Sequence, residues 1–191
     1  MGTLSEQIIV LEGGRELAFS FADMLRYNGH RSPGGVAHAF KVLEGALPVL
    51  GAAGPPERRA IAVETSFSGP GARDGFELVT RAVTDGRYRI EPSLMRPDNG
   101  SARERFVFRL RYRDSGVTLA LRDGFVTEEF LELAARQNRS PGEERELDEL
   151  KGEMAERVMS APTAEVYDAM PTTREGATEA AALDRPEEGG P

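Results

Sequence analysis

The segment from Tyr27 to Gly35 combines residue types that can do chemistry, and it runs directly into a helical pattern. It holds His30, one of only two histidines in the chain. Its Pro-Gly-Gly ending would place backbone N–H groups and the imidazole beside a helix N-terminus, where negative charge is stabilised. An imidazole can also bind a metal ion or act as a general acid or base. The segment therefore predicts a loop that binds something small, either anionic or metallic.

Four further residues are candidates for the same site. Within the loop, Ser32 could contact a ligand or cap the following helix, and Gly34 would let a ligand approach the backbone. Glu64 ends a strand pattern, and Asp74 begins the next helical pattern, where an acid also stabilises the helix dipole. Together with His30, these carboxylates would suit a divalent metal such as Zn, Fe or Mn better than copper(I).

Two other features carry weaker signals. His38 lies off the apolar stripe of its helical pattern, so we expect it to face solvent, and a second ligand reaching toward a dimer partner is the alternative. Arg109, Arg111 and Arg113 share one face of a strand pattern. They could bind an anion or a partner, although a solvated face that discourages edge pairing explains them equally well.

Composition excludes several classes of function. The chain has 191 residues, a formal net charge of −8 and no cysteine. The negative charge argues against binding to nucleic acid or to anionic membranes, and the lack of cysteine rules out disulfides, thiolate metal sites and cysteine nucleophiles. No segment approaches the roughly 20 apolar residues of a membrane span, and no signal-peptide pattern begins the chain. We therefore expect a cytoplasmic protein.

The elements that must position these residues follow from local patterns. The spacing of apolar residues predicts helices and strands in alternation, then a hairpin, then further helices. A short strand or an arm packed on the domain is predicted over 5–12. Helices are predicted over 20–27, 35–50 and 72–83, and from Thr127 and Ser140 onward. Strands are predicted over 60–67, 87–90, 105–113 and 117–121, and one or two more helical turns over 163–170. This order predicts one α+β (mixed α/β) domain over 1–170, with helices packed on a largely antiparallel sheet. Residues 171–191 lack an apolar period, so we predict a disordered acidic tail there.

These motifs resemble the FmdE family, which is named after a component of formylmethanofuran dehydrogenase. That family has a Gly-His-x-Cys-Pro-Gly loop opening a helix, and here residues 29–34 read Gly-His-Arg-Ser-Pro-Gly. The helix beginning near Asp74 reads Asp-Gly-Phe-Glu-Leu-Val-Thr, similar to the family's Asp-Ala-Ile-Gln-x-x-Thr pattern. The stretch from Met154 to Tyr167 is similar to the family's C-terminal helix. The resemblance covers about residues 20–170 and implies homodimers.

The departures from the family pattern concern its metal site. The family's loop cysteine is Ser32 here, the segment from Glu64 to Ser68 lacks the expected second cysteine, and Arg81-Ala82 stands where Gly-Cys is frequent. In the family those thiolates and the histidine would make a metal site, so their loss removes most of the affinity for soft metals. The resemblance thus implies the fold more strongly than the chemistry.

Three functional hypotheses follow. The leading one is a small domain that binds a small molecule or a hard divalent metal at the Gly29–Gly35 loop, with Glu64 and Asp74 completing the site. The second is an enzyme in which His30 is the catalytic acid or base acting on a small organic substrate. The third is a non-catalytic interaction protein that docks through the arginine face or the tail.

Overall fold

The computed structural model describes residues 7–173. Its helices are α1 (Phe21–Asn28), α2 (Pro33–Leu50), α3 (Pro70–Thr80), α4 (Glu128–Ala135), α5 (Pro141–Ser160) and α6 (Thr163–Val166). Its strands are β1 (Gln7–Glu12), β2 (Arg15–Ser20), β3 (Ala62–Thr65), β4 (Tyr88–Ile90), β5 (Val107–Tyr112), β6 (Ser115–Leu121) and β7 (Tyr167–Thr173). Short 3-10 turns cover Arg58–Ala60, Pro92–Leu94 and Pro97–Asn99.

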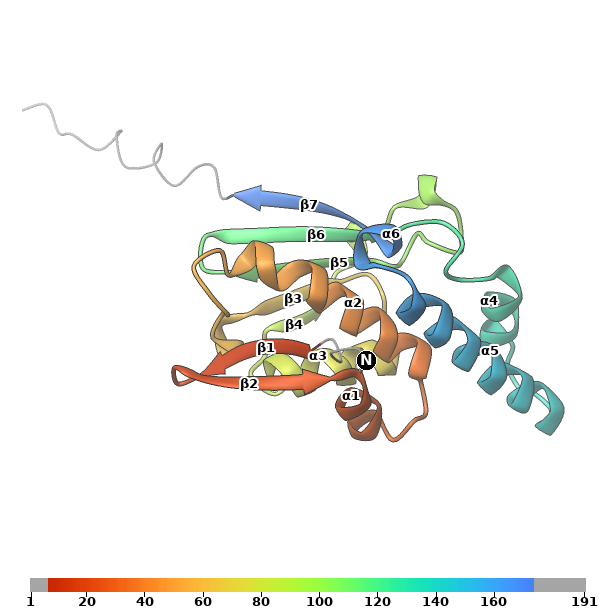
Figure 1. Ribbon diagram of the computed structural model, residues 1–191. Helices are drawn as coiled ribbons and strands as arrows, with labels where there is room; N and C mark the ends of the chain where they lie inside the picture. The colour runs from red at the N-terminus through yellow and green to blue at the C-terminus, as the bar shows by residue number, and fades with distance from the viewer. Residues whose placement is uncertain (1–6, 174–191) are drawn as a thin grey trace, which may run out of the picture.

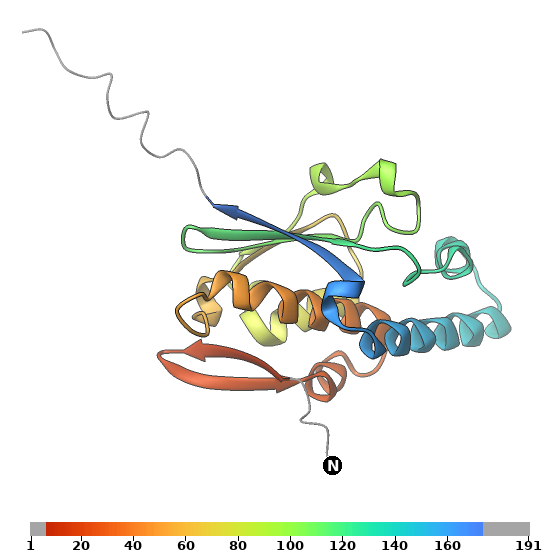
Figure 2. The ribbon, with the colours of Figure 1, turned by 45° about the horizontal axis from the view of Figure 1, so that its top comes forward.

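The strands form two sheets. A five-stranded sheet has the order β4-β3-β5-β6-β7, in which β3 and β4 are parallel and the other neighbours are antiparallel. A separate hairpin consists of β1 and β2. Helices α2 and α3 lie between the large sheet and this hairpin, and α5 and α4 extend from one end (Figures 1 and 2). The predicted mixed α+β domain with a largely antiparallel sheet is confirmed.

The core forms around α2, because this helix packs against the large sheet, α3 and α5. Its apolar residues are spread around most of its circumference, and a helix of that kind belongs in an interior. The sheet supplies the opposite wall through the alternation of its strands. On β5, Phe108 and Leu110 are fully buried toward the helices, whereas Arg109 and Arg111 reach the other face. This alternation is the one predicted.

Local signals account for where the other helices begin. Ser140 and Glu143 form the predicted capping box at the start of α5. Ser20 and Asp23 form a second one at the start of α1. The side chain of Thr127 accepts a hydrogen bond from the Phe130 N–H at the start of α4. Each of these helices also has an acidic residue in its first turn.

Three parts of the fold differ from the predicted elements. Strand β1 agrees with one of the two alternatives for residues 5–12, but β2 and its pairing with β1 were not predicted; this hairpin turns at Gly13 and Gly14, which both have positive φ. Helix α6 has a single turn, and the chain then enters β7 rather than continuing as a helix to residue 170. Strand β7 ends at Thr173, three residues into the predicted tail, and 174–191 lie outside the described residues. Within 7–173, no helix combines the length and the apolar character that a membrane span needs.

Candidate functional site

His30 belongs to the end of α1. Gly29 and His30 both have positive φ, at 69° and 61°, and their N–H groups donate to the carbonyls of Arg26 and Leu25. This arrangement closes the helix C-terminus. The His30 side chain is exposed, and no hydrogen bond joins it to any residue that the structure describes. The imidazole therefore lies on the outside of the loop rather than in an enclosed site.

Asn28, which was not among the predicted site residues, holds the loop in place. It is 7% exposed, its Nδ2 donates to Asp74 Oδ2 at 2.8 Å, and its Oδ1 accepts from the Ser32 N–H at 2.8 Å. Asp74 is therefore brought to the loop as predicted, but as the anchor of Asn28. The signal in the sequence was an amide side chain at the end of a helix, directly before a turn.

Glu64 lies on the other face of the large sheet. It accepts hydrogen bonds from Arg109 Nε at 2.7 Å and from Arg111 Nη2 at 2.6 and 2.7 Å. Burial raises the pKa of Glu64, but the hydrogen bonds from the two arginines outweigh it and leave the pKa lowered. The structure does not bring Glu64 together with the Gly29–Gly35 loop. Within 7–173, no three His, Cys, Asp or Glu side chains are grouped so that they could hold a metal ion.

Ser32 and Gly34 do lie at a built feature, the place where α2 and α3 begin side by side. We call residues 32–36 and 69–72 the paired helix starts. A Cβ on Gly35 would lie 3.0 Å from the Ala72 nitrogen, and a Cβ on Gly71 would lie 2.3 Å from the Ser32 carbonyl oxygen. Only glycine allows the two backbones to come so close.

The paired helix starts lack the side-chain caps that α1, α4 and α5 have. Ser32 is the N-cap residue of α2, as one of the predicted alternatives had it, but its side chain makes no capping hydrogen bond. Gly69 is the N-cap residue of α3 and has no side chain that could make one. Neither first turn contains an acidic residue. Two positive helix ends, with backbone N–H groups that no capping side chain accepts from, therefore meet at one place.

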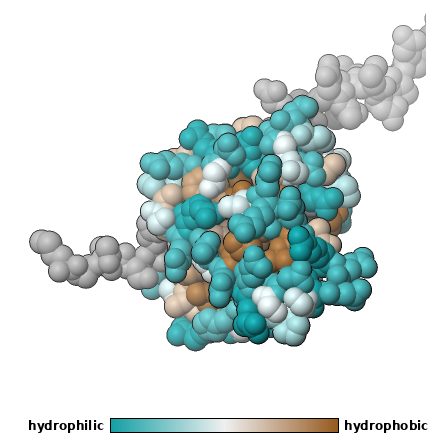
Figure 3. All heavy atoms as spheres, turned by 90° about the vertical axis from the view of Figure 1, so that its right-hand side faces the viewer, coloured by the Kyte–Doolittle hydropathy of each residue, from teal (hydrophilic) through white to brown (hydrophobic). Residues whose placement is uncertain are grey.

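A small pocket opens at the paired helix starts. Its volume is about 120 Å³, and its walls are mainly aromatic and apolar. The residues that line it are Ser32, Gly34, Gly35, Phe67, Gly69, Pro70, Gly71, Phe106, Phe130, Lys151 and Met154. Seen from the α4–α5 end of the molecule, apolar surface shows between hydrophilic side chains (Figure 3). Lys151 is the one charged residue of the lining, and it pairs with Asp148 at 2.8 Å.

His38 is fully buried, which corrects the prediction that it faces solvent. It lies one helical turn after Gly34, and its Nδ1 is 2.7 Å from the Tyr167 hydroxyl. Burial lowers the pKa of His38 to about 3, so the imidazole is neutral at physiological pH, and burial also raises the pKa of Tyr167. The ring centroid of His38 is 4.8 Å from that of Phe106, a wall of the pocket.

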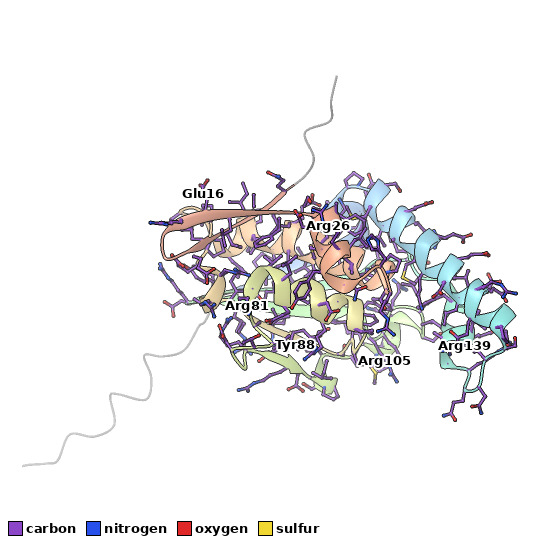
Figure 4. All side chains as sticks on the ribbon, turned by 90° about the horizontal axis from the view of Figure 1, so that it is seen from below. Glu16, Arg26, Arg81, Tyr88, Arg105 and Arg139 are labelled. Carbon is purple, nitrogen blue, oxygen red and sulfur yellow. The ribbon has the colours of Figure 1, made fainter. Side chains whose placement is uncertain are left out.

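Two buried side-chain atoms within 7–173 have no hydrogen-bond partner, His38 Nε2 and the Tyr88 hydroxyl. Tyr88 lies beside α3, with its ring centroid 6.2 Å from that of Phe76 (Figure 4). His38 is next to the pocket lining, because Phe106, whose ring centroid lies 4.8 Å from that of the imidazole, lines the pocket and stacks on Phe67. Phe106 of the pocket lining therefore packs against a buried imidazole whose Nε2 has no hydrogen-bond partner among the described residues.

No known family model matches this chain, and no curated protein sequence matches it either.

Proposed function

We propose that this chain is a cytoplasmic, FmdE-like domain that binds a small organic anion at the paired helix starts. The observation that carries the proposal is the meeting of two uncapped helix N-termini at one apolar pocket. Helix N-termini favour negative charge and offer free N–H donors. The aromatic walls favour an apolar body. A short-chain carboxylate combines both properties and suits a pocket of about 120 Å³.

The resemblance to the FmdE family supports this location. The family's loop cysteine corresponds to Ser32, which lines the pocket. The second expected cysteine is missing from the segment Glu64 to Ser68, which contains one further lining residue, Phe67. Two of the three places where the family pattern has a cysteine thus lie at or beside this pocket, whereas the third, Arg81-Ala82, is not part of its lining. The homodimer that the resemblance implies stays a prediction.

The geometry favours ligand binding over the two other chemistries considered for the loop. Catalysis by His30 requires a polar pocket that encloses the imidazole, but this side chain is exposed. A hard-metal site requires His30, Glu64 and Asp74 to converge, and Glu64 lies across the sheet beside Arg109. The proposal therefore concerns a small molecule rather than a metal ion.

Calorimetric titration of the full chain with butyrate tests the proposal, and butyramide serves as the uncharged control. We expect butyrate to bind and butyramide to bind at least tenfold more weakly, because only the carboxylate uses the helix ends and Lys151. The K151Q variant should weaken butyrate binding about tenfold, whereas R145Q, an exposed site on the same helix, should not change it. Equal binding of both probes, or equal effects of both variants, would overturn the proposal.

A further variant separates this proposal from the original prediction for the loop. H30A removes the loop imidazole, which does not line the pocket. We expect H30A to bind butyrate as the parent chain does. If H30A lost butyrate binding while circular dichroism showed that it was still folded, the binding site would lie at His30 on the exposed side of the loop and not in the pocket.

A further inference from the structure

The outer face of the large sheet, on the side away from α2 and α3 (Figure 2), has an ordered cluster of charged side chains. Glu64 on β3 lies opposite Arg109 on β5, and Arg111 follows two residues later on the same face. Both guanidinium groups donate to the one carboxylate, at 2.6 to 2.7 Å. Glu64 is 16% exposed, so the carboxylate lies beneath the two guanidinium groups rather than in open water.

This carboxylate positions two arginines and neutralises only one of them. Each guanidinium has five N–H donors in a fixed fork that matches the geometry of carboxylates and phosphates. The contacts with Glu64 use a minority of these donors. The side chains of Arg109 and Arg111 are 33% and 53% exposed, so their remaining N–H groups are accessible. Two guanidinium groups are thus fixed in position with N–H donors that an anion could reach.

A hollow of about 380 Å³ lies beside these arginines. It is lined by Arg109, Arg111, Arg113, Asp114, Ser115, Gly116, Thr118 and Thr172. Gly116 stands opposite Arg111 on β6, and a Cβ there would lie 3.0 Å from Thr172 Oγ1, so the missing side chain helps to keep the hollow open. The lining also offers three hydroxyl groups as hydrogen-bond partners.

The charge of the residues that line the hollow is opposite in sign to that of the chain. Three arginines and one carboxylate, that of Asp114, belong to its lining, and the carboxylates of Glu64 and Glu91 lie beside Arg109. The whole chain has a formal net charge of −8. Toward the other end of β5 the same face is covered, because Val107 and its partner Ala120 are both buried although they point outward. The hollow is therefore a bounded positive site rather than part of a general basic surface.

We infer that this hollow binds a small molecule that carries two or more negative charges on oxyanion groups, either phosphoryl or carboxylate. Arg109 and Arg111 are the ligand-contacting residues, and Glu64 is a positioning residue that fixes both forks. The site lies on the opposite face of the sheet from the paired helix starts. Its ligand therefore differs from the proposed short-chain carboxylate, and either site can fail its test while the other passes.

The test is calorimetric titration of the full chain at low ionic strength with pyrophosphate and with citrate, and acetate is the singly charged control. We expect at least one of the two multivalent anions to bind, and acetate to bind at least tenfold more weakly. Whichever of the two binds more tightly identifies the oxyanion class. Binding of neither would overturn the inference.

Variants separate a built site from a loose attraction to positive charge. R111Q should weaken binding at least tenfold, whereas R122Q, an arginine of similar exposure paired with Asp168 at the edge of the sheet, should change it less than twofold. E64Q removes a negative charge, which alone would favour an anion, but it also removes the carboxylate that holds both guanidinium groups, and we expect weaker binding. Tighter binding by E64Q, or equal losses in R111Q and R122Q, would show a general electrostatic effect and overturn the inference. Thermal melting confirms that each variant is folded.

Discussion

His38 gives the fold an acid sensitivity that can be measured directly. The imidazole is fully buried and accepts no proton until the pH falls to about 3, whereas in the unfolded chain it titrates near its ordinary pKa of 6.5. Between these two values the unfolded state binds one proton more than the folded state. Stability must therefore decrease as the pH falls through this window, and it is fully retained above pH 6.5.

The size of the effect follows from the same difference in pKa. One pH unit within the window corresponds to about 1.4 kcal/mol of unfolding free energy. Lowering the pH from 6.5 to 5 should therefore remove about 2 kcal/mol, which for a domain of this size lowers the melting temperature by roughly 4–8 °C. Acidic groups with a lowered pKa, such as Glu64, stay ionised in both states over most of this range, so the slope reports mainly on histidine.

Urea denaturation between pH 7 and pH 5 measures this slope, and H38L is the variant that removes it. The single variant leaves the Tyr167 hydroxyl without its partner, so it should lose about 1–3 kcal/mol at pH 7. H38L combined with Y167F removes both polar partners and should recover most of that loss. Both variants should be almost insensitive to pH between 6.5 and 5.

The other histidine provides the control for this prediction. Because the His30 side chain is exposed, H30A should keep the slope of the parent chain. If H38L also kept the slope, His38 would not be buried as a neutral group. If H30A lost the slope instead, the acid sensitivity would belong to the loop, and the reasoning from burial would be refuted.

Two further predictions concern the paired helix starts and the loop before them. G35A would place a Cβ 3.0 Å from the Ala72 nitrogen, and backbone cannot yield as a side-chain end can, so we expect a loss of about 1–3 kcal/mol by urea denaturation. On α5, a Cβ at Gly152 would meet nothing within 4 Å, so G152A should stabilise the fold by up to about 1 kcal/mol by restricting the unfolded chain. A loss of stability in G152A would contradict the reasoning that separates crowded from open glycine positions. N28D keeps the acceptor for the Ser32 N–H but places a second carboxylate next to Asp74. The melting temperature of N28D should therefore fall further below that of the parent chain at pH 7 than at pH 4, because the two carboxylates repel each other when both are ionised. An equal loss at both pH values would mean that the two side chains are not in contact.

Elements with a local cause were predictable from the sequence. The capping box at Ser140 and the β5–β6 hairpin each depend on a few neighbouring residues, and both are present. The β1–β2 hairpin also had a local signal, since Gly13-Gly14 lies between two short apolar runs, and a Gly-Gly pair in that place is typical of a tight turn. Strand β7 had none, because its apolar content is low and it contains Pro171. It exists through its pairing with β6, and proline is tolerated there because β7 is an edge strand.

The candidate site was predictable only in part, and the period of the strand explains one failure. Val63 is buried toward the helices, so Glu64, the next residue on β3, must point to the other face. The same alternation that was predicted from Ile61 to Glu64 thus already separates Glu64 from a loop on the helix side. The prediction that His38 faces solvent was wrong for a different reason. The apolar stripe of α2 was interpreted as its only buried face, but Ala37, Ala39 and Val42 make the helix apolar on nearly every side.

A cysteine at position 32, as in the family pattern that the loop resembles, would be compatible with the arrangement seen here, because the contacts that hold the loop do not use that side chain. The Ser32 N–H is bonded to Asn28, its carbonyl accepts from the Val36 N–H, and the same carbonyl excludes a side chain at Gly71. These contacts involve only backbone atoms of residue 32. A thiol and a hydroxyl are therefore interchangeable for the fold at this position, whereas a metal ion distinguishes strongly between them. The arrangement of the paired helix starts therefore does not depend on whether the side chain of residue 32 can bind a metal ion.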